Sequence, residues 1–290
     1  MTGLFDSANG VLGRRLFTTT WVPVVGFGAL VGVLVLSATG WAGAQRAWTG
    51  LSGDLRALAI TLFIVATVVL AQLLDIARPG LIRLYEGYGV AQPFAEWRKK
   101  RLDDKSLRDL RPWALPTKDA MMPTRFGNII RAAEQQARRY GMDAATAWPR
   151  LYVTLPEAFT NHFSTAASAV DLTVTISFLG VMFAVGGGVF ALALLPWYAF
   201  VGCVAGGALV GWLGYCAAVR AAFGYGELVR AAFDVHRWLL LDAMGLARPT
   251  SIGAEREQWR QLHQLWQRGV PDAEQDHLLG FPKDKGVPGK

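Results

Sequence analysis

The chain has 290 residues, of which 52% are hydrophobic and 18% are charged, and its formal net charge is +7. A soluble domain carries about 25% charged residues. The apolar residues are concentrated in four blocks, over residues 21–44, 57–76, 170–195 and 197–219. Each block reaches the ~20 residues that a helix needs to cross the hydrocarbon core of a bilayer. The composition therefore excludes a soluble enzyme or a disordered chain and predicts an all-α integral membrane protein.

The first apolar block has some features of a cleavable signal. Arg14 and Arg15 precede it, and Ala42, Gly43 and Ala44 at its end form an A-x-A pattern. However, the block is longer than the ~7–15 apolar residues of a signal sequence, and tryptophans bracket it as interfacial anchors do. We therefore expect a span that is retained in the mature protein, with cleavage as the alternative.

Lysine and arginine residues are concentrated in two segments outside the apolar blocks. Residues 77–169 hold fifteen of them and the residues after 219 hold ten, whereas the turn at 195–197 holds none. The positive-inside rule therefore predicts that both termini and the central segment lie in the cytoplasm. The positive charge is then a signal of topology. Because no nucleic-acid-binding module accompanies it, we expect no nucleic-acid partner.

The expected fold is four transmembrane helices, arranged as two hairpins, with a helical cytoplasmic domain. Its parts are an N-terminal segment with the first hairpin (1–76), a cytoplasmic helical segment (77–169), the second hairpin (170–219), a cytoplasmic helical extension (220–270) and a loose tail (271–290). Arg78, Pro79 and Gly80 are expected to end the second span.

The central segment contains patterns of several shorter helices. Phe126, Ile129 and Ala133 recur at helical spacing, and Gly141 offers a left-handed cap beyond them. Asp143 is expected to cap a short helix that Pro149 breaks. A helix that opens at residue 157 is expected to continue into the third span.

Helical patterns also follow the fourth span. The pattern continues from residue 220 to about residue 244, and a separate amphipathic helix is predicted over 255–268. In that helix Trp259, Leu262 and Trp266 share one face. We expect this face to dock on the cytoplasmic domain of the same protein.

A short block in the central segment is distinctive. Between residues 123 and 157 the chain reads PTRFGN, RAAE, YGMD, WPRL and LPE in succession. The block resembles one in a scattered group of bacterial multi-span membrane proteins whose function is unsettled. The resemblance implies a bacterial origin and a location in the cytoplasmic (inner) membrane, and it brings no catalytic residues.

Motifs of known chemistry are absent from the sequence. It holds no phosphate-binding loop, H-E-x-x-H, G-x-S-x-G or C-x-x-C motif. The histidines are scattered, at His162, His236, His263 and His277. We therefore expect no enzyme activity, no cofactor and no metal site.

The candidate functional residues lie in and near the spans. Asp75 and Asp171 are expected near the inner ends of the second and third spans, where ionisable groups are costly and often functional. They could share a cation or a proton, or pair with Arg78. Alternatively, Asp171 caps its helix and Asp75 faces water.

The third span carries a face that is polar only at its inner end. Asp171 and Thr175 lie on this face, followed by Leu179, Met182 and Gly186. In a ring of copies the face would line a pore, with Asp75, Asp171 and Thr175 as ion-pathway candidates. It could equally be a helix–helix seam. The glycines at 186–188 and in the fourth span predict close helix packing, either within one chain or between copies.

Four consecutive cations, Arg98, Lys99, Lys100 and Arg101, follow the second span. Such a cluster suits an anionic lipid surface, where each cation is worth about 1 kcal/mol. A solvated helix face that only enforces orientation is the alternative.

Two functions fit this sequence, and in both the lipid bilayer is a partner. The first is a homo-oligomeric channel or pore-like effector with a cytoplasmic gating and assembly domain. The second is a membrane-anchored scaffold or sensor whose cytoplasmic helices recruit a partner protein. A small transporter is less favoured, because internal repeats and broken helices are missing.

Overall fold

The computed structural model describes residues 17–89, 96–97, 113, 115–269 and 279, and it is all-helical over these residues, without a β-strand. Four helical segments are long and apolar enough to cross a membrane, namely Thr18–Thr39, Gly53–Glu86, Glu157–Leu194 and Trp197–Ala243. The prediction of an all-α fold with four helices long and apolar enough to cross a membrane is therefore confirmed.

The chain divides into two compact units. Unit 1 comprises Met1–Gly89 and Ala167–Ala221, and unit 2 comprises Val90–Ala166 and Ala222–Lys290. Helices α9 (Glu157–Met182) and α11 (Trp197–Ala243) contribute residues to both units. This confirms that the helix opening at residue 157 continues into the third span and that the helix of the fourth span extends to about residue 244.

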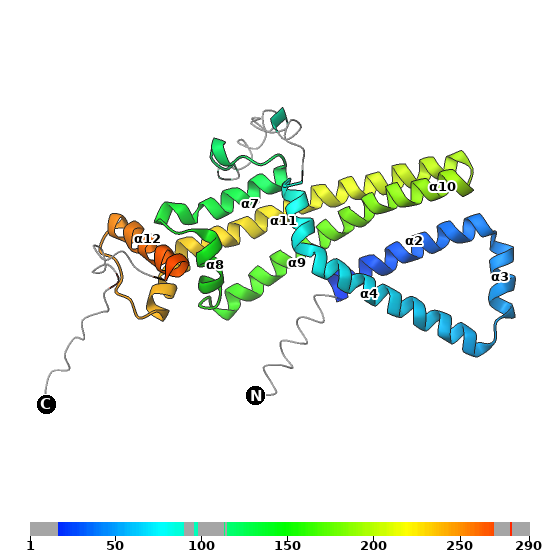
Figure 1. The fold of residues 1–290 in the computed structure, drawn as a ribbon, viewed down its shortest axis with the longest axis horizontal. Helices are drawn as coiled ribbons and strands as arrows, with labels where there is room; N and C mark the ends of the chain where they lie inside the picture. The colour runs from blue at the N-terminus through cyan, green and yellow to red at the C-terminus, as the bar shows by residue number, and fades with distance from the viewer. Residues whose placement is uncertain (1–16, 90–95, 98–112, 114, 270–278, 280–290) are drawn as a thin grey trace. The chain divides into compact units, whose positions relative to one another are not determined.

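Unit 1 begins with a hairpin that contains an extra helix. A π-helical turn, η1 (Phe17–Trp21), leads into α2 (Val22–Thr39). Gly40, with a φ of 84°, separates α2 from α3 (Trp41–Gly50). Figure 1 shows α3 joining the far ends of α2 and α4, which diverge toward it. The expected end of the first span at residue 44 is therefore wrong, because α2 ends at Thr39, before Gly40, whose positive φ interrupts the helix.

The second span is longer than the sequence predicts. Helix α4 (Gly53–Glu86) passes through Pro79 and ends at Gly87, whose φ is 100°. The expected stop at Arg78, Pro79 and Gly80 is wrong. A proline removes one helical hydrogen bond, and beyond it Tyr85 holds the helix by donating a 2.8 Å hydrogen bond to Ser177.

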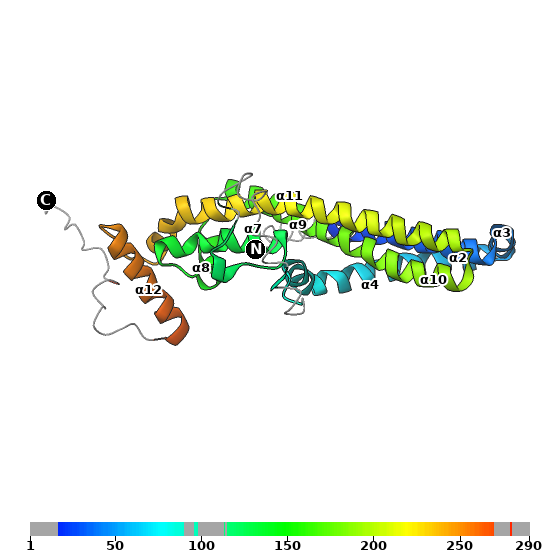
Figure 2. The ribbon, with the colours of Figure 1, turned by 90° about the horizontal axis from the view of Figure 1, so that it is seen from above.

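The second hairpin of unit 1 is closely packed. Helix α9 continues through a π-helical turn, η5 (Phe183–Gly187), into α10 (Gly188–Leu194), which lies beside the first part of α11 (Figures 1 and 2). A Cβ atom on Gly180 would lie 2.5 Å from the nitrogen of Gly211, and one on Gly207 would lie 2.5 Å from the nitrogen of Ala184. These glycines thus let the two helix backbones approach within one chain.

Unit 2 is a set of short helices around parts of α9 and α11. Its own elements are η3 (Lys118–Ala120), α7 (Arg125–Gln135), η4 (Ala137–Tyr140), α8 (Ala144–Tyr152) and α12 (Ile252–Arg268). Among its described residues, the fully buried large apolar side chains are those of Phe126, Ile129, Leu151, Phe233, Leu241, Trp259 and Leu262. Burial of Trp259 and Leu262 confirms that α12 docks on its own chain.

The predicted caps of unit 2 are present. The side chain of Asp143 accepts a 3.1 Å hydrogen bond from the Thr146 amide at the start of α8, and Gly141 has a φ of 82°. Helix α8, however, is not broken at Pro149 and runs to Tyr152. The rings of Trp148 and Tyr152, on either side of the proline, both pack against Phe163, at 5.0 and 5.7 Å.

Candidate functional site

Arg78 of α4 is the centre of a polar cluster in unit 1. Its Nη1 lies 3.2 Å from Oδ2 of Asp171 on α9, and its Nη2 donates a 2.9 Å hydrogen bond to Oγ1 of Thr20 in η1. Arg78 also forms an ion pair with Asp75, one turn earlier on α4. We call these four residues the Arg78 cluster. It connects three segments of unit 1 that are distant in sequence.

The members of the Arg78 cluster differ in burial. The side chain of Asp171 is 5% exposed and that of Arg78 is 18% exposed, whereas that of Asp75 is 38% exposed. A buried charge is costly unless it is paired and hydrogen-bonded. The planar guanidinium presents five donors in a fixed fork, so it can serve two carboxylates and a hydroxyl at once. The cluster therefore depends on all of its members being present.

The structure brings two of the predicted ion-pathway residues together. Asp75 and Asp171 share the guanidinium of Arg78, which was one of the arrangements that the sequence left open. The alternative role of Asp171 as a helix cap is wrong, because α9 already begins at Glu157. A role of Asp75, Asp171 and Thr175 in ion passage stays a prediction.

Within one chain, the first part of the predicted polar face of α9 is a helix–helix seam. Asp171, Thr175 and Leu179 are all buried. Leu179 packs in a small core cluster with Val24 of α2 and Ala71 of α4. The later residues of the face, Met182 and Gly186, are exposed.

A second polar contact lies further along α9. The hydroxyl of Ser177 is 2.7 Å from the carbonyl oxygen of Gly211, to which it donates, and it accepts a hydrogen bond from Tyr85. The Tyr85 and Tyr215 rings lie 6.3 Å apart. Sequence reasoning missed Tyr85. The available signal was its spacing of two helical turns from Arg78, which places both side chains on the same face of α4.

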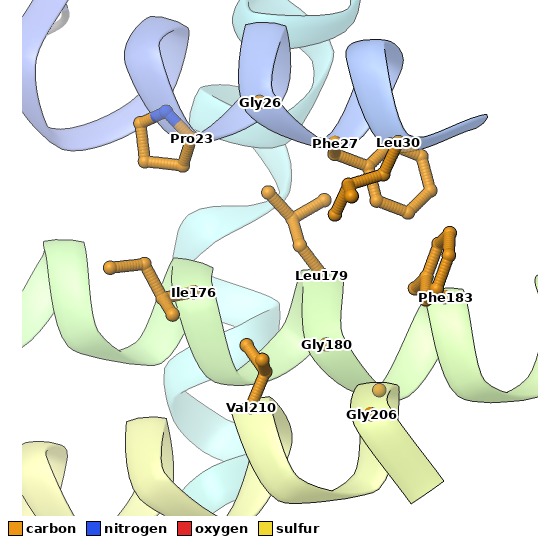
Figure 3. A pocket seen from close by; sticks show the side chains of 11 residues that line it. Pro23, Gly26, Phe27, Leu30, Ile176, Leu179, Gly180, Phe183, Gly206 and Val210 are labelled. Atoms are coloured by element: carbon orange, nitrogen blue, oxygen red, sulfur yellow. The ribbon is translucent and has the colours of Figure 1, made fainter. Parts of the chain in front are cut away.

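An apolar groove lies beside these contacts in unit 1 (Figure 3). It has a volume of about 350 Å³ and is lined by Pro23, Gly26, Phe27 and Leu30 of α2, by Ile176, Leu179, Gly180 and Phe183, and by Gly206, Gly207 and Val210 of α11. The ring of Phe27 meets the ring of Phe183 edge-on, at 6.4 Å. None of the described residues that line the groove is charged, so its chemistry suits apolar side chains or an acyl chain.

The groove and the Arg78 cluster are neighbours along α9. Ile176 follows Asp171 by five residues, or ~7.5 Å at a rise of ~1.5 Å per residue. Thr20 likewise comes just before Pro23 in the first span. Unit 1 therefore places a charged cluster at one end of an apolar groove.

A separate polar network lies in unit 2. Glu255 of α12 accepts hydrogen bonds from Arg237 at 2.6 Å and from Trp238 at 2.8 Å. Asp234 accepts hydrogen bonds from Tyr140 at 2.8 Å and from Gln136 at 2.6 Å. We call this set the Glu255 network. It ties α12 and η4 to the same stretch of α11.

The electrostatics of the Glu255 network follow from these contacts. Burial raises the pKa of Glu255, but the hydrogen bonds from Arg237 and Trp238 outweigh it, so the net pKa lies below the ordinary value of 4.5. Burial, followed by the hydrogen bond to Asp234, raises the pKa of Tyr140. Glu255 thus favours its charged form, as expected of a structural ion pair.

Several residues of the distinctive block have structural roles in unit 2. Thr124 caps α7 through the Gly127 amide, at 2.9 Å. The buried amide of Asn128 exchanges two hydrogen bonds with the backbone of Met122, at 2.7 and 3.0 Å. Gly141 lies against the backbone of Arg256, where a side chain would not fit. These residues position helices, and this explains much of the block.

The remaining predicted sites have different outcomes. Arg98, Lys99, Lys100 and Arg101 lie outside the described residues. Among the residues that are described, no group of three His, Cys, Asp or Glu side chains could hold a metal ion.

Comparison with known proteins adds no functional assignment, because no family model, curated protein or solved structure matches the chain at a significant level.

Proposed function

We propose that the protein is a homo-oligomeric channel or pore-like effector of the bacterial inner membrane. In this proposal both termini and unit 2 lie in the cytoplasm, and unit 2 serves for gating and assembly. The Arg78 cluster is the observation that carries the proposal. Ionisable groups held between membrane-spanning helices are rare and mark ion pathways and relays.

The distribution of charge supports the proposed orientation. Twenty-five of the 29 lysine and arginine residues lie in residues 77–169 or after residue 219. The positive-inside rule places such segments in the cytoplasm. The four spans would then form two hairpins whose turns face outward.

Two features of unit 1 support assembly with further copies. Only 11% of the most apolar window of each of the first two spans is buried, so most of their surface is left for lipid or another chain. On α11, Cβ atoms on Gly202 and Gly206 would meet nothing within 4 Å. They are four residues apart, a spacing at which small residues bring membrane helices together.

The Arg78 cluster provides a mechanism for opening. It joins α4 of the first hairpin to α9 of the second. If the hairpins separate, Asp171 and Thr175 leave their seam and face the space between the helices. Two carboxylates opposite one guanidinium would then attract cations to that space.

The test uses the full chain, reconstituted in lipid nanodiscs and planar bilayers. We expect a closed oligomer by mass measurement and a cation conductance that Asp171→Asn reduces at least tenfold. Asp54→Asn is the matched control, because Asp54 is an exposed carboxylate in the first turn of α4. A monomer without conductance would overturn the proposal, and equal effects of both substitutions would remove the role of Asp171.

A membrane-anchored scaffold or sensor is the second candidate. The observation in its favour is the apolar core of unit 2, which is built from its own residues. Such a unit could recruit a partner protein even if the transmembrane helices conduct no ions. Co-purification of a stoichiometric cytoplasmic protein, without ion flux in liposomes, would favour this candidate over the channel.

A further inference from the structure

Unit 2 contains a cavity of about 470 Å³ that is rich in arginine. Among the described residues, its polar and aromatic lining consists of Trp113, Thr117, Gln135, Gln136, Arg138, Arg139 and Arg230, and none of them is acidic. We call it the basic cavity. Its volume lies in the range of ~300–1,000 Å³ that is typical of sites for small molecules.

The arginines of the basic cavity differ from several others in unit 2. Arg237, Arg131, Arg248 and Arg260 each form an ion pair with a carboxylate. Within the described part of the chain, no ion pair involves Arg138, Arg139 or Arg230. Their charges therefore remain available to an anion.

The cavity is held in place by contacts of its walls. The guanidinium of Arg230 lies 4.6 Å from the ring centre of Trp113, and that ring meets Phe223 edge-on. The amide of Thr117 donates a 2.9 Å hydrogen bond to the side chain of Gln135. Arg256 of α12 donates a 2.8 Å hydrogen bond to the carbonyl oxygen of Arg139. A site with positioned donors loses less conformational entropy when it binds.

The positive charge continues beyond the basic cavity. A second cavity, of about 380 Å³, shares Arg138 and is also lined by Arg256, Arg260 and His263. Asp143 lines it as well, but its carboxylate caps the amide of Thr146. Both sides of η4 therefore present guanidinium groups.

We propose that the basic cavity binds a phosphorylated ligand through its phosphoryl groups. Guanidinium groups match phosphate oxygens in pairs, which makes arginine the preferred side chain for phosphate recognition. One phosphate would leave most of the cavity empty, so the expected ligand carries several phosphoryl groups or a phosphorylated headgroup. The ligand could be a soluble polyphosphorylated molecule or a lipid headgroup, and the chemistry of the site is the same for both. The proposal holds whether or not unit 1 conducts ions.

The first arm of the test measures soluble ligand. The full chain, in nanodiscs of phosphatidylcholine only, is titrated with inorganic tripolyphosphate by calorimetry. We expect saturable binding that Arg138→Gln combined with Arg139→Gln weakens at least tenfold. The matched control combines Arg125→Gln with Arg268→Gln, which removes two exposed charges elsewhere in unit 2. It should change the affinity less than twofold.

The second arm measures lipid headgroups with the same variants. Short-chain phosphatidylinositol bisphosphate replaces tripolyphosphate, in the same nanodiscs. Binding of this lipid alone, lost in the cavity variant and kept in the control, would assign the site to a headgroup. Binding of tripolyphosphate with the same pattern would assign it to a soluble ligand.

Two results would overturn the proposal. One is the absence of binding in both arms by a protein whose hydrogen exchange shows unit 2 to be folded. The other is equal weakening by the cavity and control variants, since that result would mean attraction to net charge only. Arg230→Gln tests the wall of the cavity separately from the exposed Arg138 and Arg139. It removes the guanidinium that lies over the ring of Trp113.

Discussion

The two units differ in how many large apolar side chains they bury. In unit 1 the buried residues include many polar ones: Thr19, Thr20, Thr67, Asp171, Thr175 and Ser177. Its large apolar side chains are mostly exposed, with Ile76 at 75% and Leu192 at 66%. Unit 2 also buries polar side chains, namely Asn128, Gln136, Glu255, Gln258 and Gln261, but its largest buried side chains are aromatic and aliphatic, led by Trp259, Phe126 and Phe233. Each unit nevertheless contains a buried carboxylate that is paired with an arginine.

The difference is the one expected if unit 1 lies in lipid and unit 2 in water. Between helices in lipid there is no hydrophobic driving force, so association depends on close packing and polar contacts. In water, removal of apolar surface is the dominant favourable term. The same chain thus uses polar contacts and glycine packing in unit 1 and an apolar core in unit 2. Substitutions that remove either a polar or glycine contact of unit 1 or a core side chain of unit 2 test this difference between the units directly.

The largest effect is expected from Trp259→Ala in unit 2. Trp259 is 1% exposed, and truncation of a buried tryptophan costs roughly 3–5 kcal/mol. Hydrogen exchange should show loss of protection in α7, α8 and α12, while the spans of unit 1 stay protected. Ile252→Ala, on the same helix but 65% exposed, should change stability by less than about 0.5 kcal/mol. Equal protection in both variants would contradict an apolar core.

The next effect is expected from Asp171→Asn in unit 1. The substitution leaves the largely buried Arg78 with Asp75 as its only carboxylate in the cluster. Removal of one partner from a buried ion pair costs about 3 kcal/mol. Thermal unfolding of the reconstituted chain should show a lower midpoint, whereas Asp54→Asn should leave it unchanged. A midpoint equal to that of the unsubstituted chain would mean that the cluster does not stabilise unit 1.

A smaller effect is expected at the glycines of α11. A Cβ atom on Gly207 would overlap the backbone of Ala184, whereas one on Gly206 would meet nothing within 4 Å. Gly207→Ala should therefore destabilise unit 1 by about 1–3 kcal/mol through overpacking. Gly206→Ala should not, although the two residues are adjacent. The difference in unfolding midpoint between the two variants measures how closely α9 and α11 pack.

The smallest effect is expected from acid acting on the Glu255 network. The folded-state pKa of Glu255 is lowered below 4.5. The stabilisation from its charged form is therefore complete above about pH 4.5 and is lost as the pH falls through the folded-state pKa. Glu255→Gln should be less stable at neutral pH and should lose less stability on acidification. Glu257→Gln is the control, because Glu257 forms a surface pair with Arg260. An acid response unchanged in Glu255→Gln would contradict this assignment.

Local patterns predicted the helices well. The four apolar blocks, the cap at Asp143 and the left-handed Gly141 depend on residues close in sequence, and all are present. The predicted helix ends were wrong where tertiary contacts outweighed a local helix-breaking signal. Pro79 and Pro149 should end helices, but contacts of Tyr85 and Trp148 with distant residues keep those helices continuous.

The polar contacts were harder to predict than the helices. Spacing along α4 places Asp75 near Arg78, but it does not reveal Thr20, which belongs to a different segment. Gln136 and Tyr140 each lie more than ninety residues from Asp234, so no local pattern links either of them to it. Such contacts depend on tertiary packing, which periodicity alone does not describe.

The two carboxylates and one guanidinium of the Arg78 cluster give it a formal charge of −1. A charge that moves through the electric field of a membrane couples to the transmembrane voltage, at about 2.3 kcal/mol per elementary charge and 100 mV. Movement of the whole cluster through a quarter of that field would thus be worth about 0.6 kcal/mol for each copy. In an oligomer these contributions add, so the electrical state of the cell would bias the arrangement of its helices.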